Sequence, residues 1–234
     1  MDVDPIAYLF HASLASEAKG CEACSLRTGR TNVVFGKGPV PATMMAIGEG
    51  PGGDEDRTGE PFVGPAGVVL DTMFSSMGLR RDEVYVTNLV KCRPPKNRAP
   101  LTEEVDACTH RWLLRQVEEI VKPEVILALG SSATRFFFGE AISNVHGTWT
   151  TWRDRPVFAL HHPAHFIWTE SQGAEVAERA RAQTRRALGT LRDALRARAL
   201  ATPTGRPDED RGRDPHSDQR DETKAASITA ACRR

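Results

Sequence analysis

Four short apolar segments constrain the fold of this chain more than any other feature of its sequence. They lie at residues 42–49, 83–90, 124–132 and 156–163. Helical patterns at residues 66–78 and 102–121 separate the first three segments, and another begins at residue 131. Strands that alternate with helices indicate parallel βαβ units, and strands that are apolar throughout are covered on both faces. We therefore predict an α/β fold, a three-layer αβα sandwich around a four-stranded, mainly parallel sheet.

The composition divides the chain near residue 200. Hydrophobic residues make up 40% of the 234 residues, enough for a sizeable core over most of the length. Helical patterns at residues 5–17 and 174–200 flank the alternating region. Residues 201–234 contain almost no large apolar side chains and carry both charges, so we expect a disordered polar tail there. Residues 1–200 are then predicted to form a single domain.

The charge and the N-terminal sequence limit the classes of partner. Formal net charge is zero at pH 7, which excludes a bulk polycation but allows a local basic groove. The first ten residues lack a basic region before an apolar core, so they do not read as a signal peptide. No apolar run approaches the roughly 18 residues of a membrane span. We expect a cytoplasmic protein without a membrane partner.

Polar side chains follow the ends of the predicted strands. They are Glu49, Asn88, Ser131, Ser132 and His162. Ligands of open α/β sheets bind beyond the carboxyl ends of the strands, so we expect these side chains to meet at one edge. The Asn88 amide could read the polar edge of a base, and His162 could stabilise an oxyanion. A turn-forming role for Asn88 and a structural role for His162 are the alternatives, and each is the commoner outcome for such a residue alone.

The loop after the first apolar segment, GEGPGGDEDRTGEPFVGPAG, is rich in glycine but also acidic. Glycine-rich loops often bind phosphate through exposed backbone N–H groups. The carboxylates of this loop, Glu49 and residues 54–56, would repel a phosphate. Phe62 in the same loop either packs internally or offers a surface on which a planar ring stacks.

The cysteines indicate a metal centre. Cys21 and Cys24 form a CxxC pair, whereas Cys92 and Cys108 stand alone and Cys232 lies in the tail. This arrangement suits a four-thiolate iron–sulfur cluster at least as well as zinc, which normally shows two CxxC pairs. The alternative for Cys108 is an ordinary buried position.

A basic loop that contains prolines lies beside the predicted strand-end site. Its cationic residues are Lys91, Arg93, Lys96 and Arg98, within VKCRPPKNRAP. Such a loop could contact the phosphates of a nucleic acid. The alternative is a solvated loop without a ligand.

Together these motifs resemble the iron–sulfur, family-four uracil-DNA glycosylases. The matching pieces are GEGPGGDEDRTGEPFVGPAG, TNLVKCRPPKNRAP, ACTHRWLLRQ, ALGSSA and HHPAH, which occur in the family's order. The resemblance implies a monomeric DNA repair enzyme that hydrolyses the N-glycosidic bond of uracil in DNA and leaves an abasic site. It also implies a [4Fe-4S] cluster on four cysteine ligands, namely Cys21, Cys24, Cys92 and Cys108.

The resemblance further implies roles for the loop and the strand ends. Phe62 stacks on a flipped-out uracil, Asn88 reads its polar edge, and Glu55 crowds C5 and excludes the methyl group of thymine. His162 stabilises the charge that develops on O2, while Glu49 and the backbone at Gly50 hold the attacking water. The residues expected at the DNA phosphates are Arg93, Lys96, Arg98, Ser131 and Ser132.

Three departures from the family patterns bear on the mechanism. Gly50 stands where the best-known glycosylase family has a water-activating aspartate. The segment after HHPAH leaves Phe166 or Ile167 as the candidate wedge into the duplex. Residues 93–107 lack the histidine and the insertion of a branch that forms covalent DNA adducts, so we expect turnover. The rival interpretations are a non-catalytic iron–sulfur protein that binds or senses uracil-containing DNA, and a zinc-stabilised α/β protein with an unrelated ligand.

Overall fold

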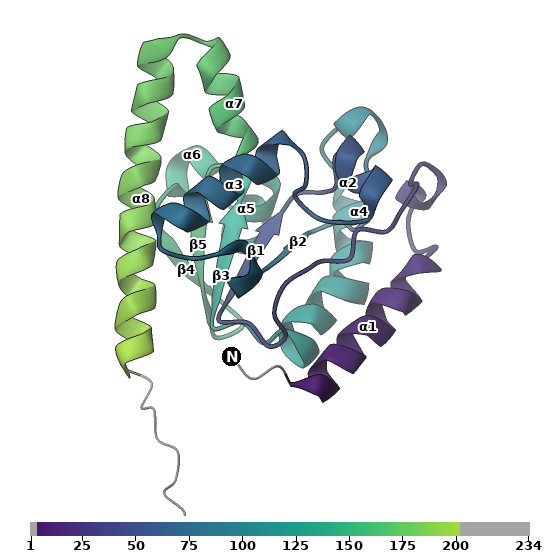
Figure 1. Ribbon diagram of the computed structural model, residues 1–234. Coiled ribbons are helices and arrows are strands. Elements are labelled where there is room, and N and C mark those ends of the chain that lie inside the picture. The colour runs from purple at the N-terminus through teal and green to yellow at the C-terminus, as the bar shows by residue number, and fades with distance from the viewer. Residues whose placement is uncertain (1–3, 202–234) are drawn as a thin grey trace, which may run out of the picture.

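The fold is an αβα sandwich in the computed structural model, which describes residues 4–201 (Figure 1). The central sheet has the strand order β2-β1-β3-β5-β4. Its strands are β1 (Met44–Gly48), β2 (Val84–Asn88), β3 (Val125–Leu129), β4 (Trp149–Trp152) and β5 (Arg155–Leu160). The strands β2, β1, β3 and β5 pair in parallel, which confirms the predicted α/β class. Of the tail predicted at residues 201–234, Ala201 ends a helix and residues 202–234 lie outside the described residues.

The prediction of four strands was wrong, because β4 adds a fifth. This strand pairs with β5 in an antiparallel hairpin at the edge of the sheet. Its residues alternate between exposed and partly buried, so it lacks the continuous apolar run of a central strand. The turn residues Arg153 and Asp154 have φ values of 48° and 62°. Left-handed conformations at both central residues are typical of two-residue hairpin turns. Such turns usually contain glycine or asparagine, and this one contains neither.

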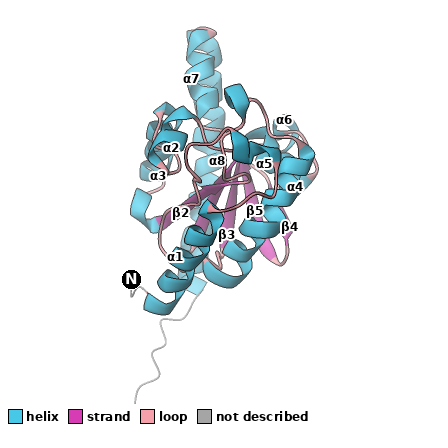
Figure 2. Ribbon diagram, turned by 90° about the vertical axis from the view of Figure 1, so that its right-hand side faces the viewer, coloured by secondary structure: helices cyan, strands magenta, loops and turns pink. Residues whose placement is uncertain are grey.

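Helices cover both faces of the sheet (Figure 2). They are α1 (Pro5–Lys19), α2 (Gly53–Thr58), α3 (Pro65–Ser76), α4 (Thr102–Cys108), α5 (Gly130–Phe138), α6 (Ile142–Val145), α7 (Ala164–Ser171) and α8 (Ala174–Ala201). The region predicted as one helix over residues 102–121 is α4 followed by π-helical turns at Thr109–Leu113 and Gln116–Ile120. Among the described residues, no helix is both long and apolar enough to cross a membrane.

Alternate residues of each strand supply two separate cores. Met45 and Ile47 of β1 pack with α1, with α5 and with the helical region after α4. Met44 and Ala46 pack on the opposite face with α3 and α8. This period of two follows from the pleat of the strands. The sheet is therefore packed on both faces by helices, and the carboxyl ends of its parallel strands lie together at one edge.

Candidate active site

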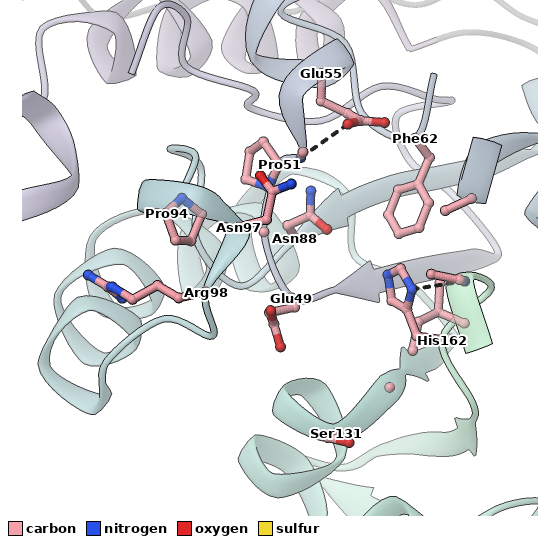
Figure 3. Close-up of a pocket in the computed structure, with 16 residues that line it drawn as sticks. Glu49, Pro51, Glu55, Phe62, Asn88, Pro94, Asn97, Arg98, Ser131 and His162 are labelled. Carbon is pink, nitrogen blue, oxygen red and sulfur yellow. Dashed lines mark hydrogen bonds between the residues drawn. The ribbon is translucent and has the colours of Figure 1, made fainter. Parts of the chain in front are cut away.

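A pocket of about 470 Å³ opens at the carboxyl ends of the parallel strands (Figure 3). It is lined by every residue that was predicted to bind or activate a base, namely Glu49, Gly50, Glu55, Phe62, Asn88 and His162. Of the predicted DNA contacts, Arg98 and Ser131 also line it, whereas Arg93, Lys96 and Ser132 do not. Topology brings these residues together from segments more than a hundred residues apart.

Gly48 allows the two central residues of the pocket to approach β1. It pairs with Asn88 across the parallel strands. A Cβ atom at Gly48 would lie 2.5 Å from Asn88 Oδ1 and 2.7 Å from Phe62 Cζ. Asn88 is only 2% exposed, and its Oδ1 has no hydrogen-bond partner within the described part of the chain. An unpaired buried acceptor is costly, and this one would be satisfied by a donor on a ligand.

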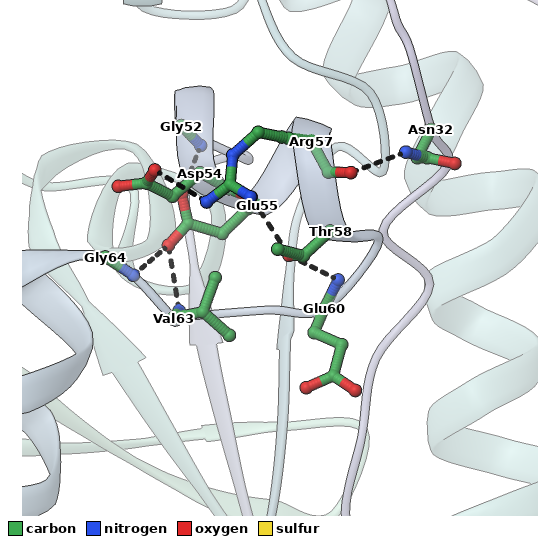
Figure 4. A network of polar contacts seen from close by, with 9 residues as sticks. All are labelled: Asn32, Gly52, Asp54, Glu55, Arg57, Thr58, Glu60, Val63 and Gly64. Atoms are coloured by element: carbon green, nitrogen blue, oxygen red, sulfur yellow. Dashed lines mark hydrogen bonds and ion pairs between the residues drawn. The ribbon is translucent and has the colours of Figure 1, made fainter.

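Glu55 braces the loop that carries Phe62 (Figure 4). Its Oε1 accepts hydrogen bonds of 2.9 Å from the backbone N–H groups of Val63 and Gly64, and its Oε2 accepts one of 3.1 Å from Gly52. Phe62 itself has a φ of 53°, which is uncommon for a bulky residue. The carboxylate therefore holds the loop on both sides of the pocket mouth, a contact that the sequence did not reveal.

His162 presents a neutral imidazole to the pocket. Its ring stacks on Phe62 with the centroids 5.7 Å apart. Burial lowers the pKa of His162 to about 4, against an opposing effect of the Glu55 carboxylate. The backbone N–H of Ala164 donates to Nδ1 at 3.2 Å, so the neutral ring carries its proton on Nε2. That N–H is a hydrogen-bond donor for an acceptor in the pocket.

Glu49 is held by a residue that was predicted to contact DNA. Ser132, in the first turn of α5, donates a hydrogen bond of 2.5 Å to Glu49 Oε2. Ser131 is exposed at the pocket rim instead. The two neighbouring serines therefore differ in environment: Ser132 orients a carboxylate, and Ser131 faces the space above the pocket.

The basic loop is partly committed to internal contacts. Arg98 makes a two-pronged ion pair with Glu104, with N–O distances of 2.8 and 2.7 Å. Glu104 is 0% exposed, and its hydrogen bond with Arg98 lowers its pKa to about 2. Arg93 donates to Asn97 Oδ1 at 2.8 Å and remains at the surface. Lys96 is exposed and lies in the left-handed region, with a φ of 54°.

The four predicted metal ligands border one cavity, which shares no lining residue with the pocket. They are Cys21, Cys24, Cys92 and Cys108. Three N–H groups donate to their sulfur atoms: the backbone of Lys91 to Cys108 at 3.3 Å, Trp112 to Cys21 at 3.3 Å, and Arg30 to Cys92 at 3.5 Å. Such donors stabilise thiolates and tune iron–sulfur centres.

The environment of these cysteines fits a large anionic group better than isolated thiols. Burial raises the pKa of Cys108 to about 12, so a thiolate there needs a positive centre beside it. Among residues 4–201, no three His, Cys, Asp or Glu side chains have the geometry to hold a single metal ion. Four cysteines around one cavity, three of them with an N–H donor to sulfur, fit the ligand set of an iron–sulfur cluster.

The burial of Lys91 differs most from what the sequence predicted. It was expected in the basic surface loop, but it is 1% exposed. Its Nζ donates to Thr87 Oγ1 at 2.6 Å and to the Asn88 carbonyl at 2.7 Å. Burial lowers the pKa of Lys91 to about 7, against the opposing effects of Cys108 and Cys92.

Further lining residues were missed from the sequence. They are Pro51, Gly52, Ala66, Pro94, Asn97, Leu129, Gly130 and Ala164. Most are small or apolar residues, whose side chains have no polar or titratable group that would suggest a functional site. Asn97 has a φ of 55°, and an asparagine between a lysine and an arginine in a proline-containing loop was the one signal that could have drawn attention to it.

Comparison with known proteins gives a consistent result. A family model described as the uracil DNA glycosylase superfamily matches residues 35–188. The Type-4 uracil-DNA glycosylase of Thermotoga maritima is 43% identical over 162 residues, which cover 68% of this chain and 83% of that protein. The Type-4 enzyme of Archaeoglobus fulgidus is 43% identical over 165 residues, with 66% and 82% covered. That of Pyrobaculum aerophilum is 48% identical over 112 residues, with 48% and 56% covered.

Proposed function

This chain belongs to the uracil DNA glycosylase superfamily, and from that premise we propose that the pocket at the sheet edge is where uracil is excised from DNA. The protein is a DNA repair glycosylase of the Type-4 group. It hydrolyses the N-glycosidic bond of uracil in DNA and leaves an abasic site. The buried, unpaired Oδ1 of Asn88 is the observation that carries the assignment of the pocket.

Asn88 recognises the polar edge of the base in this proposal. Its Oδ1 accepts the N3–H of uracil, and its amide N–H₂ donates to O4. Cytosine presents the opposite pattern, with an acceptor at N3 and a donor at C4, so it leaves the buried acceptor unsatisfied. Phe62 supplies the stacking surface, and Glu55 keeps the Phe62 loop in place while its own side chain limits space near C5.

His162 acts on the uracil base as the N-glycosidic bond breaks, and Glu49 acts on the sugar and the attacking water. As the bond from N1 to C1′ breaks, its electron pair moves onto the uracil ring, and the His162 Nε2–H donates to the growing charge on O2. The sugar becomes oxocarbenium-like, and the Glu49 carboxylate stabilises its positive charge. A water held by Glu49 adds its oxygen to C1′ and releases a proton, which Glu49 accepts directly or passes to solvent.

The four cysteines hold a [4Fe-4S] cluster in this proposal. When bound, the cluster supplies iron–thiolate bonds that join the N-terminal segment, the loop after β2 and the end of α4. Arg93, Lys96 and Ser131 are the residues that contact DNA phosphates in this proposal, which the exposure of Lys96 and Ser131 supports. The predicted monomer stays a prediction.

The roles of Asn88 and His162 are tested by single-turnover excision from an oligonucleotide with one uracil. Asn88→Ala and His162→Ala should each lower the rate at least about 10²-fold, the usual effect of removing one stabilising donor or acceptor. Matched controls are Asn144→Ala and His110→Ala, because both of these residues are exposed and lie outside the pocket. Rates like that of the unmodified enzyme in both folded pocket variants would refute the assignment.

A further inference from the structure

Lys91 joins the base-reading residue to the cysteine cavity. Its side chain reaches back along β2 and donates to two neutral oxygens, Thr87 Oγ1 and the Asn88 carbonyl. The same residue borders the cysteine cavity, where its backbone N–H donates to Cys108 and its chain neighbour is Cys92. One residue therefore contacts both the end of β2 and the thiol set.

The contacts of the ammonium group do not by themselves explain its burial. A buried charge is tolerated when it is paired with an opposite charge and fully hydrogen-bonded, and neither oxygen that Lys91 contacts is a carboxylate. The Phe35 ring, with its centroid 5.9 Å from Nζ, adds a weak cation–π contact. Cys108 and Cys92 are acidic groups that act electrostatically on Lys91, and as metal-bound thiolates they would carry negative charge.

We propose that Lys91 is a positioning residue that fixes Asn88 at the end of β2 and is itself held by the negative charge of the cysteine-bound cluster. The inference rests on the proposed function, because it assumes that Asn88 reads uracil and that the cysteines hold the cluster. In this inference the cluster not only cross-links the four cysteines but also holds the side chain of Lys91 through its charge. Loss of the cluster removes the charge that keeps Lys91 in place, and the carbonyl of Asn88 then loses its donor.

The position of Asn88 depends on this contact for a geometric reason. Strand β2 ends at Asn88, and the next two backbone N–H groups still hold the chain to the end of β1: Leu89 donates to the carbonyl of Gly48 at 2.9 Å, and Val90 donates to that of Glu49 at 3.1 Å. The carbonyl of Asn88 points to Lys91 instead of a neighbouring strand. A shift there moves the amide side chain, and misplacement by about 1 Å can cost on the order of 10²-fold in rate.

Lys91→Met tests the proposal in the cluster-loaded protein, since it keeps most of the unbranched side chain and removes the charge and the donors. Single-turnover excision should slow by about 10- to 100-fold. In an Asn88→Ala background the same substitution should have no further effect, as expected for two residues that act through one contact. Lys37→Met is the control, because Lys37 is exposed and pairs with Glu60 at the surface.

A second readout is independent of activity. An iron chelator removes the absorbance of the cluster at about 400 nm. This loss should be several-fold faster in Lys91→Met than in Lys37→Met. Thr87→Val provides a milder variant for the case in which Lys91→Met does not fold. It removes one acceptor of the ammonium group, and it should slow excision only when Asn88 is present.

The outcomes separate this inference from the proposed function. If Lys91→Met slows excision when Asn88 is present but not in the Asn88→Ala background, the result supports the positioning of Asn88 by Lys91. Faster bleaching of the cluster in Lys91→Met supports the contact between Lys91 and the cluster. Excision and bleaching like those of Lys37→Met would overturn it, even if Asn88→Ala alone abolishes excision. An equal loss in the presence and absence of Asn88 would also overturn it. Full excision by Asn88→Ala itself would contradict the proposed function instead.

Discussion

The absence of a side chain at position 48 is what allows the pocket to have its depth. Asn88 and Phe62 both occupy the space that a methyl group on Gly48 would fill. The backbone at Gly48 does not have a positive φ among the described glycines, so the requirement for glycine is steric. The same logic explains why Gly67 lies under the carbonyl of Phe62, where a Cβ atom would be 1.8 Å away.

Gly48→Ala should therefore impair uracil excision with little effect on folding. The new methyl group forces Asn88 or Phe62 to move, and displaced recognition groups can lower kcat/KM by about 10- to 100-fold. Gly29→Ala is the control, because no atom lies within 4 Å of a Cβ atom built there. Steady-state kinetics with uracil-containing DNA measures the effect, and equal kcat/KM values for the two variants would show that the contact is not limiting.

At the scale of single residues, the sequence located the pocket but not its internal bonds. Polar residues at strand ends had to converge, because parallel strands place their carboxyl ends at one edge. The partners of those residues depend on packing that no local pattern encodes. Ser132 binds Glu49, Arg98 pairs with Glu104, and Lys91 is buried, and none of these three environments was predicted from the sequence.

At the scale of elements, a buried ionic clip holds the cysteine-bearing segments together. Glu104, in α4, accepts hydrogen bonds from Arg98 in the basic loop and from Ser25, which follows Cys24. The clip therefore links the elements that carry Cys24, Cys92 and Cys108. Cross-links of this kind limit how far the cysteines can separate when no metal is bound.

Glu104→Gln should weaken this clip without disturbing the pocket chemistry. The variant removes the negative charge that Arg98 pairs with, and breaking an ion pair that has one buried partner is destabilising. We expect a lower melting temperature and faster chelator-induced loss of the cluster absorbance. Glu103→Gln, at the neighbouring exposed position, should change neither. A melting temperature that is equally unchanged in both variants would contradict the structural role of the clip.

The elements that the sequence missed share a physical cause. The edge strand β4 needs only one covered face, so its residues do not form an apolar run. The π-helical turns after α4 keep the helical period closely enough that a pattern search reads one continuous helix. Apolar periodicity reports burial, and it is least informative where an element is half-exposed or only slightly distorted.

At the scale of the whole molecule, two sites share one edge of a rigid sheet. The pocket opens beyond the strand ends, and the cysteine cavity is bordered by residues of α1, the basic loop and α4. Helices pack on both faces of the sheet (Figure 1) and form a hydrophobic core with each face. In the proposed function, the pocket is therefore pre-formed for base recognition, and a cluster on the four cysteines would tie the basic loop to α4 and the N-terminal segment.

The most direct test of this account is an excision assay with the unmodified, cluster-loaded protein. Oligonucleotides with one uracil, or with thymine at the same position, are incubated with substoichiometric enzyme and then treated with alkali to break abasic sites. We predict strand breaks at uracil only, with more than one product formed per enzyme molecule. Binding of the uracil strand without any abasic site, or a protein–DNA adduct that survives denaturant, would contradict the proposed turnover mechanism.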